Sequence, residues 1–458
     1  MRGVRFIVLV LTTLCLTSIL SNMNTYNFTK ICLDPSVDNS ANYSTFEKTA
    51  IQSCTAVGSL AASIPLVMAL ERFPKKFVFI AAGVISIVAT ALIPLAESLG
   101  FGYFLAVRIF QGVAFSTTFP MSGALTSEWA ALSEHGIFLA FLTGFSQLSN
   151  IFTMPVAGAL CSSSLGWRSV YYVHAGVGLV VFLLFALLFQ DRPQVGGQSQ
   201  KASESSRRRS PVPYRAVFSS LTIWGVWASG FADILAIQFI AMFQPQYLNN
   251  YLEYDVLKTG FLAALPVIVQ WLFKVFAGVS SDLLKCIGET VKLRIYNSFA
   301  LWLSAAFFIV LSFMDKSQPV LCLVILVSLL PGPPNISSLR IVTEGFMGFN
   351  TAGFNKCGTL HARQHAHFVM VQIMNIQSIC ILVEPFIVNA ILTDNSAVQW
   401  RLVFLIHAAI LVAANVLFVV FADSRPAPWT REEMPPIEEG NDGKWEVDGV
   451  ELRRKTRV

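Results

Sequence analysis

The amino-acid sequence contains about twelve apolar runs of roughly 20 residues each, separated by short polar segments. A helix of that length is as long as the hydrocarbon core of a bilayer is thick. Irregular backbone cannot cross lipid, because its N–H and C=O groups would have no hydrogen-bond partners there. The chain is also 54% hydrophobic and only 13% charged, which excludes an ordinary soluble domain. We therefore predict an all-α polytopic membrane protein.

A polar segment divides these runs into two groups of six. Residues 191–215 are rich in Ser, Pro and Arg, which is typical of a flexible linker. Two six-helix bundles around a midplane site are the arrangement of many secondary transporters. We expect an N-terminal bundle at 1–190, the linker at 191–215, a C-terminal bundle at 216–425 and a disordered tail at 426–458. The expected spans cover residues 6–26, 46–70, 77–97, 101–126, 136–160, 169–190, 221–248, 259–280, 295–314, 319–350, 368–392 and 402–422.

Charge alternation between the loops predicts how the chain lies in the membrane. Lys and Arg accumulate in alternate loops and in both terminal segments, which the positive-inside rule places in the cytoplasm. The first loop carries glycosylation sequons at Asn27 and Asn42, which are usable only on the opposite side. Both termini and the linker are thus expected in the cytoplasm. A disulfide between Cys32 and Cys161 is conceivable on the non-cytoplasmic side, with buried free thiols as the alternative.

Two segments do not fit regular membrane spans. Residues 331–334 read Pro-Gly-Pro-Pro, through which no helix continues, so the tenth span is expected to be broken. Further along, His361 and His365 are spaced to share a helix face, as a pair of metal ligands would be. Their position in a predicted cytoplasmic loop instead favours a solvated basic segment. We predict no metal site and no cofactor.

Arg108 is a charged residue inside an apolar run that is expected to cross the membrane. If the fourth span begins near residue 101, a rise of about 1.5 Å per residue places Arg108 roughly 10 Å inside the hydrocarbon core. Arg cannot release its proton, so the side chain must face a carboxylate, a wet cavity or an anionic ligand. With Gln111, one turn further along, it forms the candidate substrate-binding site. The alternative is a structural pair with a buried acid such as Asp233 or Glu384.

Two corresponding loops carry an acid beside basic residues. Glu71 and Arg72 lie between the second and third spans, and Asp282 lies between the eighth and ninth. Such groups can lock one face by ion pairing and helix-end dipoles, and release it when the bundles rock. Plain positive-inside turns are the alternative. The pattern resembles the gating loop of the major facilitator superfamily, although Val67 and Pro74 stand at two of its glycine positions.

Four groups of stretches occur in order along the chain: Arg108-Ile-Phe-Gln-Gly112 with Phe119-Pro120, Gly166-Trp-Arg-Ser-Val-Tyr-Tyr172, Gln244-Pro-Gln-Tyr247 with Thr259-Gly-Phe-Leu-Ala-Ala-Leu-Pro266, and Gln399-Trp-Arg-Leu-Val-Phe404. Together they look like the solute carrier 17 family. Its members include the vesicular glutamate transporters, sialin and the sodium–phosphate cotransporters. The similarity extends from the first span to about Trp429, and it implies an anion carrier that uses a proton, a sodium ion or the membrane potential. Arg108 matches a residue that the family uses to handle the anion.

The sequence departs from this resemblance at charged positions. Where vesicular glutamate transporters carry a glutamate and a second arginine, this chain has Phe115 and Asp233. A desolvated carboxylate in the middle of a span can alternate between paired and neutral forms. Asp233 is therefore a candidate for binding the coupling proton or sodium ion, and Glu384 in the eleventh span is a second candidate. Lys274 in the eighth span can snorkel, pair with an acid or take part in function.

We therefore predict a secondary active transporter that moves an inorganic or organic anion by alternating access. A proton or sodium gradient, or the membrane potential, would drive it. Two other classes stay open: a facilitator of a neutral or cationic solute, and a transport-inactive sensor or scaffold on the same fold. An enzyme is not expected, because the sequence lacks a phosphate-binding Gly-x-x-x-x-Gly-Lys-Ser/Thr loop. The expected partners are the anion and the lipid of a plasma membrane or a vesicle or lysosome-type membrane, without nucleic acid, and the chain is expected to be monomeric.

Overall fold

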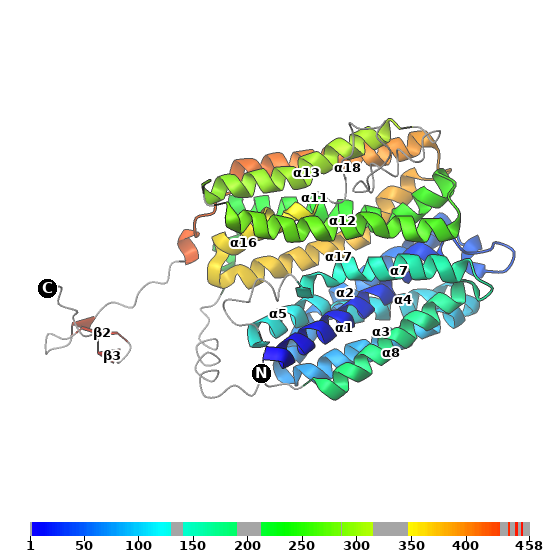
Figure 1. The fold of residues 1–458 in the computed structure, drawn as a ribbon, viewed down its shortest axis with the longest axis horizontal. Coiled ribbons are helices and arrows are strands. Elements are labelled where there is room, and N and C mark those ends of the chain that lie inside the picture. The colour runs from blue at the N-terminus through cyan, green and yellow to red at the C-terminus, as the bar shows by residue number, and fades with distance from the viewer. Residues whose placement is uncertain are drawn as a thin grey trace.

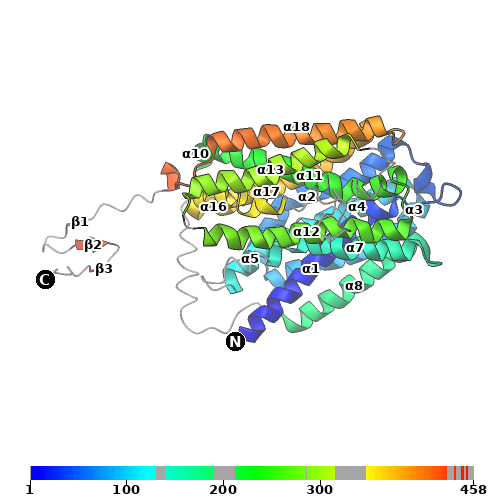
Figure 2. The ribbon, with the colours of Figure 1, turned by 45° about the horizontal axis from the view of Figure 1, so that its top comes forward.

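The computed structural model describes residues 2–129, 141–189, 212–284, 286–314 and 347–430, together with three short strands near the C-terminus. Figure 1 shows two groups of long helices side by side, one from each half of the chain, and Figure 2 shows the same division after rotation. Among the described residues, nine helices are long and apolar enough to cross a membrane. The predicted all-α polytopic architecture is confirmed.

The first group contains the helices of the N-terminal half. Its bounds follow the predicted spans closely, apart from the fourth and fifth. The α1–α2 loop between its first two helices carries the short helix η1 (Asn39–Asn42). The helices are α1 (Arg2–Thr29), α2 (Thr45–Arg72), α3 (Lys75–Leu99), α4 (Phe101–Phe115), α5 (Thr118–Trp129), α7 (Phe145–Cys161) and α8 (Gly166–Leu188).

The second group contains the helices of the C-terminal half. The expected tenth span, 319–350, lies outside the described residues except for its last four. The elements are α10 (Tyr214–Phe218), α11 (Leu221–Gln246), η2 (Tyr247–Tyr251), α12 (Val256–Leu283), α13 (Glu289–Ser312), η3 (Gly348–Thr351), α16 (Phe354–Ala362), η4 (Arg363–His365), α17 (Ala366–Ile391), α18 (Ala397–Phe421) and η5 (Pro428–Thr430).

Local sequence signals set several helix ends. The Ser44 hydroxyl accepts a hydrogen bond from the Glu47 backbone N–H, and the Glu47 carboxylate accepts from the Ser44 N–H, which together form a capping box that begins α2. Gly100 has a φ of 118°, which an L-residue rarely adopts, and separates α3 from α4. Two adjacent membrane helices can therefore reverse direction within one residue.

The fourth span is broken in its middle, where the sequence predicts one continuous helix over 101–126. Residues Ser116 and Thr117 separate α4 from α5. Pro120 has no N–H to donate to the carbonyl of Ser116. The hydroxyls of Ser116 and Thr117 bond to carbonyls three residues earlier, as does that of Thr118, which competes with regular helical bonding. The break lies directly after Phe115, which is only 1% exposed and belongs to the core.

The segment with His361 and His365, which forms the end of α16 and η4, was predicted wrongly as a solvated loop. His361 and His365 are 7% and 3% exposed. The Nδ1 of His361 lies 2.7 Å from the Arg425 carbonyl oxygen, and both imidazoles contact the Trp429 ring. They hold the chain that leaves α18 against the bundle. No group of three or more His, Cys, Asp or Glu side chains is arranged to hold a metal within the described ranges.

Short strands lie in the C-terminal tail. Residues 438–439, 445–447 and 450–451 form a three-stranded antiparallel sheet in the order β1 (Glu438–Glu439), β2 (Trp445–Val447) and β3 (Val450–Glu451). β-branched and aromatic residues such as Trp445, Val447 and Val450 favour strands. Short strands are thus described within the tail, and the expectation of a disordered tail stays a prediction.

The two halves touch at the end of the molecule that carries the α1–α2 loop. The close pairs are α7 with α12 and α2 with α17. A Cβ added to Gly260 would lie 2.6 Å from the Met154 carbonyl oxygen, so only glycine allows α12 to approach α7 so closely. On the other seam, the Asn389 side chain donates to the Thr49 hydroxyl at 2.9 Å. The halves are therefore closed against each other at the α1–α2 end.

Candidate functional site

Arg108 lies inside the N-terminal group, 1% exposed. Its Nε donates to the Ile51 carbonyl at 3.3 Å, and its Nη1 donates to the Met23 carbonyl at 2.7 Å. These bonds require α4 to lie very close to α2, and Gly112, one turn further along α4, meets the α2 backbone at Thr55. The sequence places a glycine where a side chain would separate the helices. Arg108 is thus anchored to the backbones of α1 and α2.

Gln111 extends this anchor into a polar network. Its Oε1 accepts from Arg108 Nη1 at 2.8 Å, and its Nε2 donates to the Asn22 carbonyl at 2.9 Å and the Thr90 hydroxyl at 2.8 Å. The Asn22 amide in turn donates to Ser86. The prediction that Arg108 and Gln111 act together is consistent with this geometry, because the amide orients the guanidinium.

The charge of Arg108 is not balanced by any carboxylate in the described part of the chain. Its polar partners are neutral, and its nearest aromatic contact is Tyr26, whose ring centroid lies 5.3 Å away. Nη2 makes no hydrogen bond to a described residue. Arg108 forms no ion pair with Asp233 or Glu384 in this structure: Asp233 accepts a hydrogen bond from Asn350, and Glu384 faces His407. One arm of the guanidinium fork remains for a further acceptor.

Asp233 lies in α11, 1% exposed. Its Oδ2 accepts a hydrogen bond from the Asn350 amide at 2.7 Å, while its Oδ1 has no partner among the described residues. Lys274 of α12 interacts with the carboxylate electrostatically, beyond ion-pair distance. Asp233 is therefore held from the side of η3 and faces a cation on the neighbouring helix.

Lys274 also belongs to a polar seam between the halves that the sequence did not reveal. Its Nζ lies 3.5 Å from the Thr143 hydroxyl of the N-terminal half. One turn earlier on α12, Gln270 accepts from the Gln147 amide of α7 at 3.2 Å, and the Oε1 of Gln147 is buried with no partner among the described residues. Polar side chains at one helix-repeat spacing on α7 and α12 were the available signal. The seam thus places a cation and a buried acceptor between the two halves.

Glu384 lies in α17 and is fully buried. Its Oε1 is 3.0 Å from Nε2 of His407 on α18, and its Oε2 has no partner among the described residues. Sequence reasoning identified Glu384 but missed His407. The signal was present, since a histidine in the middle of an apolar span is as costly as the acid it faces.

The predicted gating residues lie at the opposite end from the α1–α2 loop. The backbones of Glu71 and Asp282 end α2 and α12, but their side chains lie outside the described part. Arg72 is exposed. The ion pairs described at this end instead join Glu289 to Lys292 and Lys356. The role of Glu71, Arg72 and Asp282 stays a prediction.

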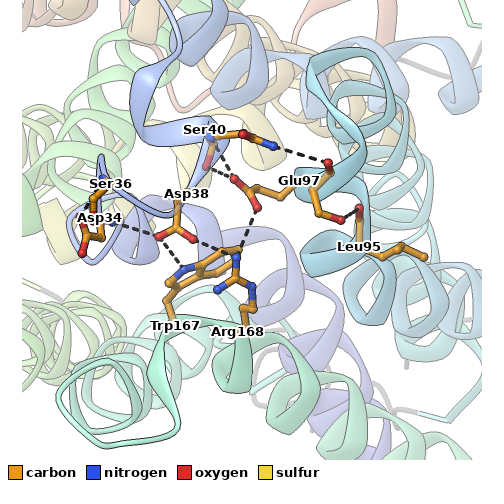
Figure 3. Close-up of polar contacts among 10 residues, drawn as sticks. Asp34, Ser36, Asp38, Ser40, Leu95, Glu97, Trp167 and Arg168 are labelled. Atoms are coloured by element: carbon orange, nitrogen blue, oxygen red, sulfur yellow. Dashed lines mark hydrogen bonds and ion pairs between the residues drawn. The ribbon is translucent and has the colours of Figure 1, made fainter.

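A second network covers the α1–α2 end (Figure 3). Asp38, only 3% exposed, accepts from the Trp167 indole at 3.0 Å and from the Arg168 guanidinium at 2.9 Å. Glu97 accepts from the Ser40 backbone at 2.9 Å and lies 3.7 Å from Arg168. These bonds fasten the α1–α2 loop onto α3 and α8. The hydrogen bonds and ion pairs of this network therefore all lie within the N-terminal half.

The cysteines and sequons at this end can now be placed. The structure contains the disulfide between Cys32 and Cys161, whose Cα atoms are 6.1 Å apart, so it joins the ends of α1 and α7. Asn42 is exposed in the loop. Asn27, however, lies inside α1 and is 3% exposed, which leaves no room for a bulky glycan. The geometry argues against Asn27 as an acceptor.

Two helix groups with charged and polar side chains buried inside them and between them define a membrane transporter. A family model described as Major Facilitator Superfamily matches residues 6–385. The chain belongs to this superfamily, which consists of transporters rather than enzymes. It is a multi-pass membrane protein and a secondary transporter of a small molecule.

Similarity to characterised relatives is distant but long. The chain is 24% identical over 393 residues to vesicular glutamate transporter 1 of Bos taurus, covering 82% of this chain and 67% of that one. It is 25% identical over 354 residues to human sialin, covering 75% of this chain and 68% of sialin. The chain thus spans about two thirds of the length of these relatives. The resemblance to the solute carrier 17 family is confirmed as distant homology.

Solved structures agree with the fold. A D-xylose–proton symporter superposes with a TM-score of 0.69 at 13% identity, covering 92% of this chain and 98% of that one. A bacterial homologue of the human lysosomal transporter Spinster superposes with a TM-score of 0.68 at 14% identity, covering 93% and 100%. At these identities the similarity shows the fold alone.

Proposed function

We propose that this protein is a secondary active transporter of an inorganic or organic anion, driven by a cation gradient or the membrane potential. The observation that carries the proposal is Arg108, a buried guanidinium with neutral partners and one arm of its fork unused. A buried cation is stabilised when an anion joins it. The distant relationship to a vesicular glutamate transporter and sialin supports an anionic substrate.

The anion and the driving cation would occupy different halves. Arg108 and Gln111 lie in the N-terminal group, whereas the buried carboxylates Asp233 and Glu384 lie in the C-terminal group. Binding both ligands would favour rocking of the halves about the seam that contains Lys274. The same carboxylates favour a cationic solute as the second candidate function.

A binding measurement tests the anion proposal. Ligands that bind the native state raise its melting temperature. We expect phosphate, acidic sugars or acidic amino acids to stabilise the purified protein, whereas matched neutral sugars leave it unchanged. An Arg108→Gln variant should lose that stabilisation, and an Arg215→Gln variant in α10 should keep it. Stabilisation by neutral or cationic solutes alone would contradict the proposal.

We also propose that both termini and the 191–215 linker are cytoplasmic, in a plasma, vesicle or lysosome-type membrane, with a monomeric chain. The α1–α2 loop would then lie on the opposite side. Asn42→Gln should remove one glycan and so increase the electrophoretic mobility of the protein, whereas Asn27→Gln should leave the mobility unchanged. Protease digestion of sealed microsomes checks the linker, which should be cleaved. A protected linker would contradict this topology.

Closure at the α1–α2 end should depend on glycine at position 260. In Gly260→Val, the added Cβ would meet the Met154 carbonyl, so α7 and α12 could not close. We expect transport to fall at least tenfold, a cost of about 1.4 kcal/mol to the closed state, with normal expression. Gly176→Val in α8, where nothing lies near the added Cβ, is the matched control. Equal transport by both variants would show that this contact is dispensable.

A further inference from the structure

The last helix of each half carries the same motif. In α8 it runs Trp167-Arg-Ser-Val-Tyr-Tyr-Val-His174, and in α18 it runs Trp400-Arg-Leu-Val-Phe-Leu-Ile-His407. Each histidine has its Nδ1 at 2.8 Å from the carbonyl oxygen four residues earlier. A carbonyl oxygen only accepts hydrogen bonds, so Nδ1 carries a proton in both histidines. The two halves therefore hold matched imidazoles in the same tautomer.

The two histidines differ in what faces Nε2. His174 is 1% exposed, its Nε2 has no partner among the described residues, and its ring lies against Phe152. His407 is equally buried, but its Nε2 lies 3.0 Å from the Glu384 carboxylate. Two lone pairs would repel at that distance, so one proton must lie between them. It is held either by the imidazole or by the carboxyl group.

The surroundings of this pair within its own half are almost free of charge. Phe239 of α11 stacks on the imidazole with ring centroids 4.4 Å apart, and Phe308 of α13 lies at 6.1 Å. Asp233 is the only charged residue of α11, and it and Glu384 both interact electrostatically with the Cys380 thiol. The charged and titratable residues of α13 are confined to its first eight residues, Glu289, Lys292, Arg294 and Tyr296.

The remaining neighbours in the described part of the chain bring no further partner. On α18, Arg401 bonds to the Ser312 carbonyl and lies over the Phe313 ring. Helix α2 of the other half packs on α17, and its thiol at this level, Cys54, lies within bonding distance of the Leu105 carbonyl of α4. The other titratable residues of α2 are near its two ends: Glu47, Lys48, Glu71 and Arg72.

We propose that Glu384 and His407 form the site that binds the coupling ion, and that this ion is a proton. The proposal rests on the proposed function and names the ion that drives it. A sodium ion needs a shell of oxygen ligands, as hard cations do. The pair offers two carboxylate oxygens, and the other described side chains in contact with the imidazole are the aromatic rings of Phe239 and Phe308. The site fits one proton between two heavy atoms.

The proton balance links this site to the motion of the halves. With its proton, the pair is neutral overall, whether as imidazolium and carboxylate or as imidazole and carboxylic acid. Release of that proton to water leaves one buried negative charge on Glu384, which apolar surroundings disfavour. Helix α17 carries Glu384 and also contacts α2 through Ser378 and Ser59, whose hydroxyl oxygens are 3.1 Å apart. Rocking at this seam would change access of water to the pair.

Reconstituted variants test the assignment. If one proton moves with each anion, the wild type can accumulate the anion roughly tenfold for each unit of pH difference. Glu384→Gln and His407→Asn should abolish this accumulation. Exchange of anion for anion should persist and lose its dependence on pH. His174→Asn is the matched control, since it removes the same imidazole without a carboxylate partner, and it should accumulate anion normally. Accumulation by Glu384→Gln that follows the pH difference as in the wild type would overturn the proposal.

A measurement that does not depend on transport separates this proposal from the function on which it rests. Infrared difference spectra of the purified protein between acid and alkaline buffer should show a carboxyl or imidazolium change in the wild type and His174→Asn. Glu384→Gln should lose it. A wild type that shows this change but accumulates no anion would overturn the proposed function and keep the proton site. Spectra unchanged by Glu384→Gln would overturn the proton site.

Discussion

Arg108→Lys is expected to lower anion transport sharply while the protein still reaches the membrane. Lysine keeps the charge, but it lacks the planar fork that bonds Ile51, Met23 and Gln111 together. The carbonyls left without a donor, and the misplaced charge, should cost about 1–3 kcal/mol, which lowers transport by up to roughly a hundredfold. Uptake per molecule at the surface, with gel filtration of the purified variant, measures this.

The matched control is Arg401→Lys in α18. Arg401 bonds the Ser312 carbonyl at the outer edge of the other half and lies over Phe313, so the same exchange is made away from the proposed anion. It should transport within about twofold of the wild type. If Arg108→Lys or Arg108→Ala transports normally, Arg108 does not hold the anion.

Asp233→Asn is expected to remove gradient-driven accumulation and to spare anion exchange. Asparagine imitates the neutral form of the acid and can still accept from Asn350, so the local fold should survive. It leaves Lys274 without the only acid of α11 to oppose it. Accumulation and exchange should be measured on the same reconstituted variant, since coupling fails only in the first. Normal accumulation by this variant would exclude Asp233 from coupling.

Adding Lys274→Gln to Asp233→Asn distinguishes two roles of Asp233: balancing the charge of Lys274, and taking part directly in coupling. If Asp233 serves only to offset Lys274, Asp233→Asn combined with Lys274→Gln should restore accumulation, since neutralising both partners removes the imbalance. If Asp233 takes part in coupling, the double variant should stay uncoupled. Lys274→Gln alone completes the cycle. We expect the double variant to stay uncoupled.

The membrane spans could be predicted because lipid imposes a length and a composition on each helix. The break after Phe115 could also have been predicted, since Pro120 and three consecutive hydroxyls follow within the same span. It was missed because the surrounding residues are apolar enough to read as one helix. The bounds of α2, α11 and α18 agree with the predicted ones within a few residues.

The partners of the buried charges could not be predicted. Asp233 meets Asn350, which is 117 residues away, and no pattern in a single sequence fixes how each helix is rotated about its axis. For the same reason the sequence allowed Arg108 to pair with Asp233, although the structure places them in different halves. The Glu384–His407 pair is different, because the repeat shared by α8 and α18 marks both histidines in the sequence itself.

Uptake of a radiolabelled anion into proteoliposomes that contain only the purified protein tests the central claim most directly. Imposed proton and sodium gradients and an imposed membrane potential would be varied one at a time across phosphate, acidic sugars and acidic amino acids. The account predicts saturable accumulation of at least one anion above its equilibrium level under an inward proton gradient, and a much lower rate of uptake in Arg108→Lys. Uptake confined to neutral or cationic solutes, or no uptake of any anion under any gradient, would contradict it.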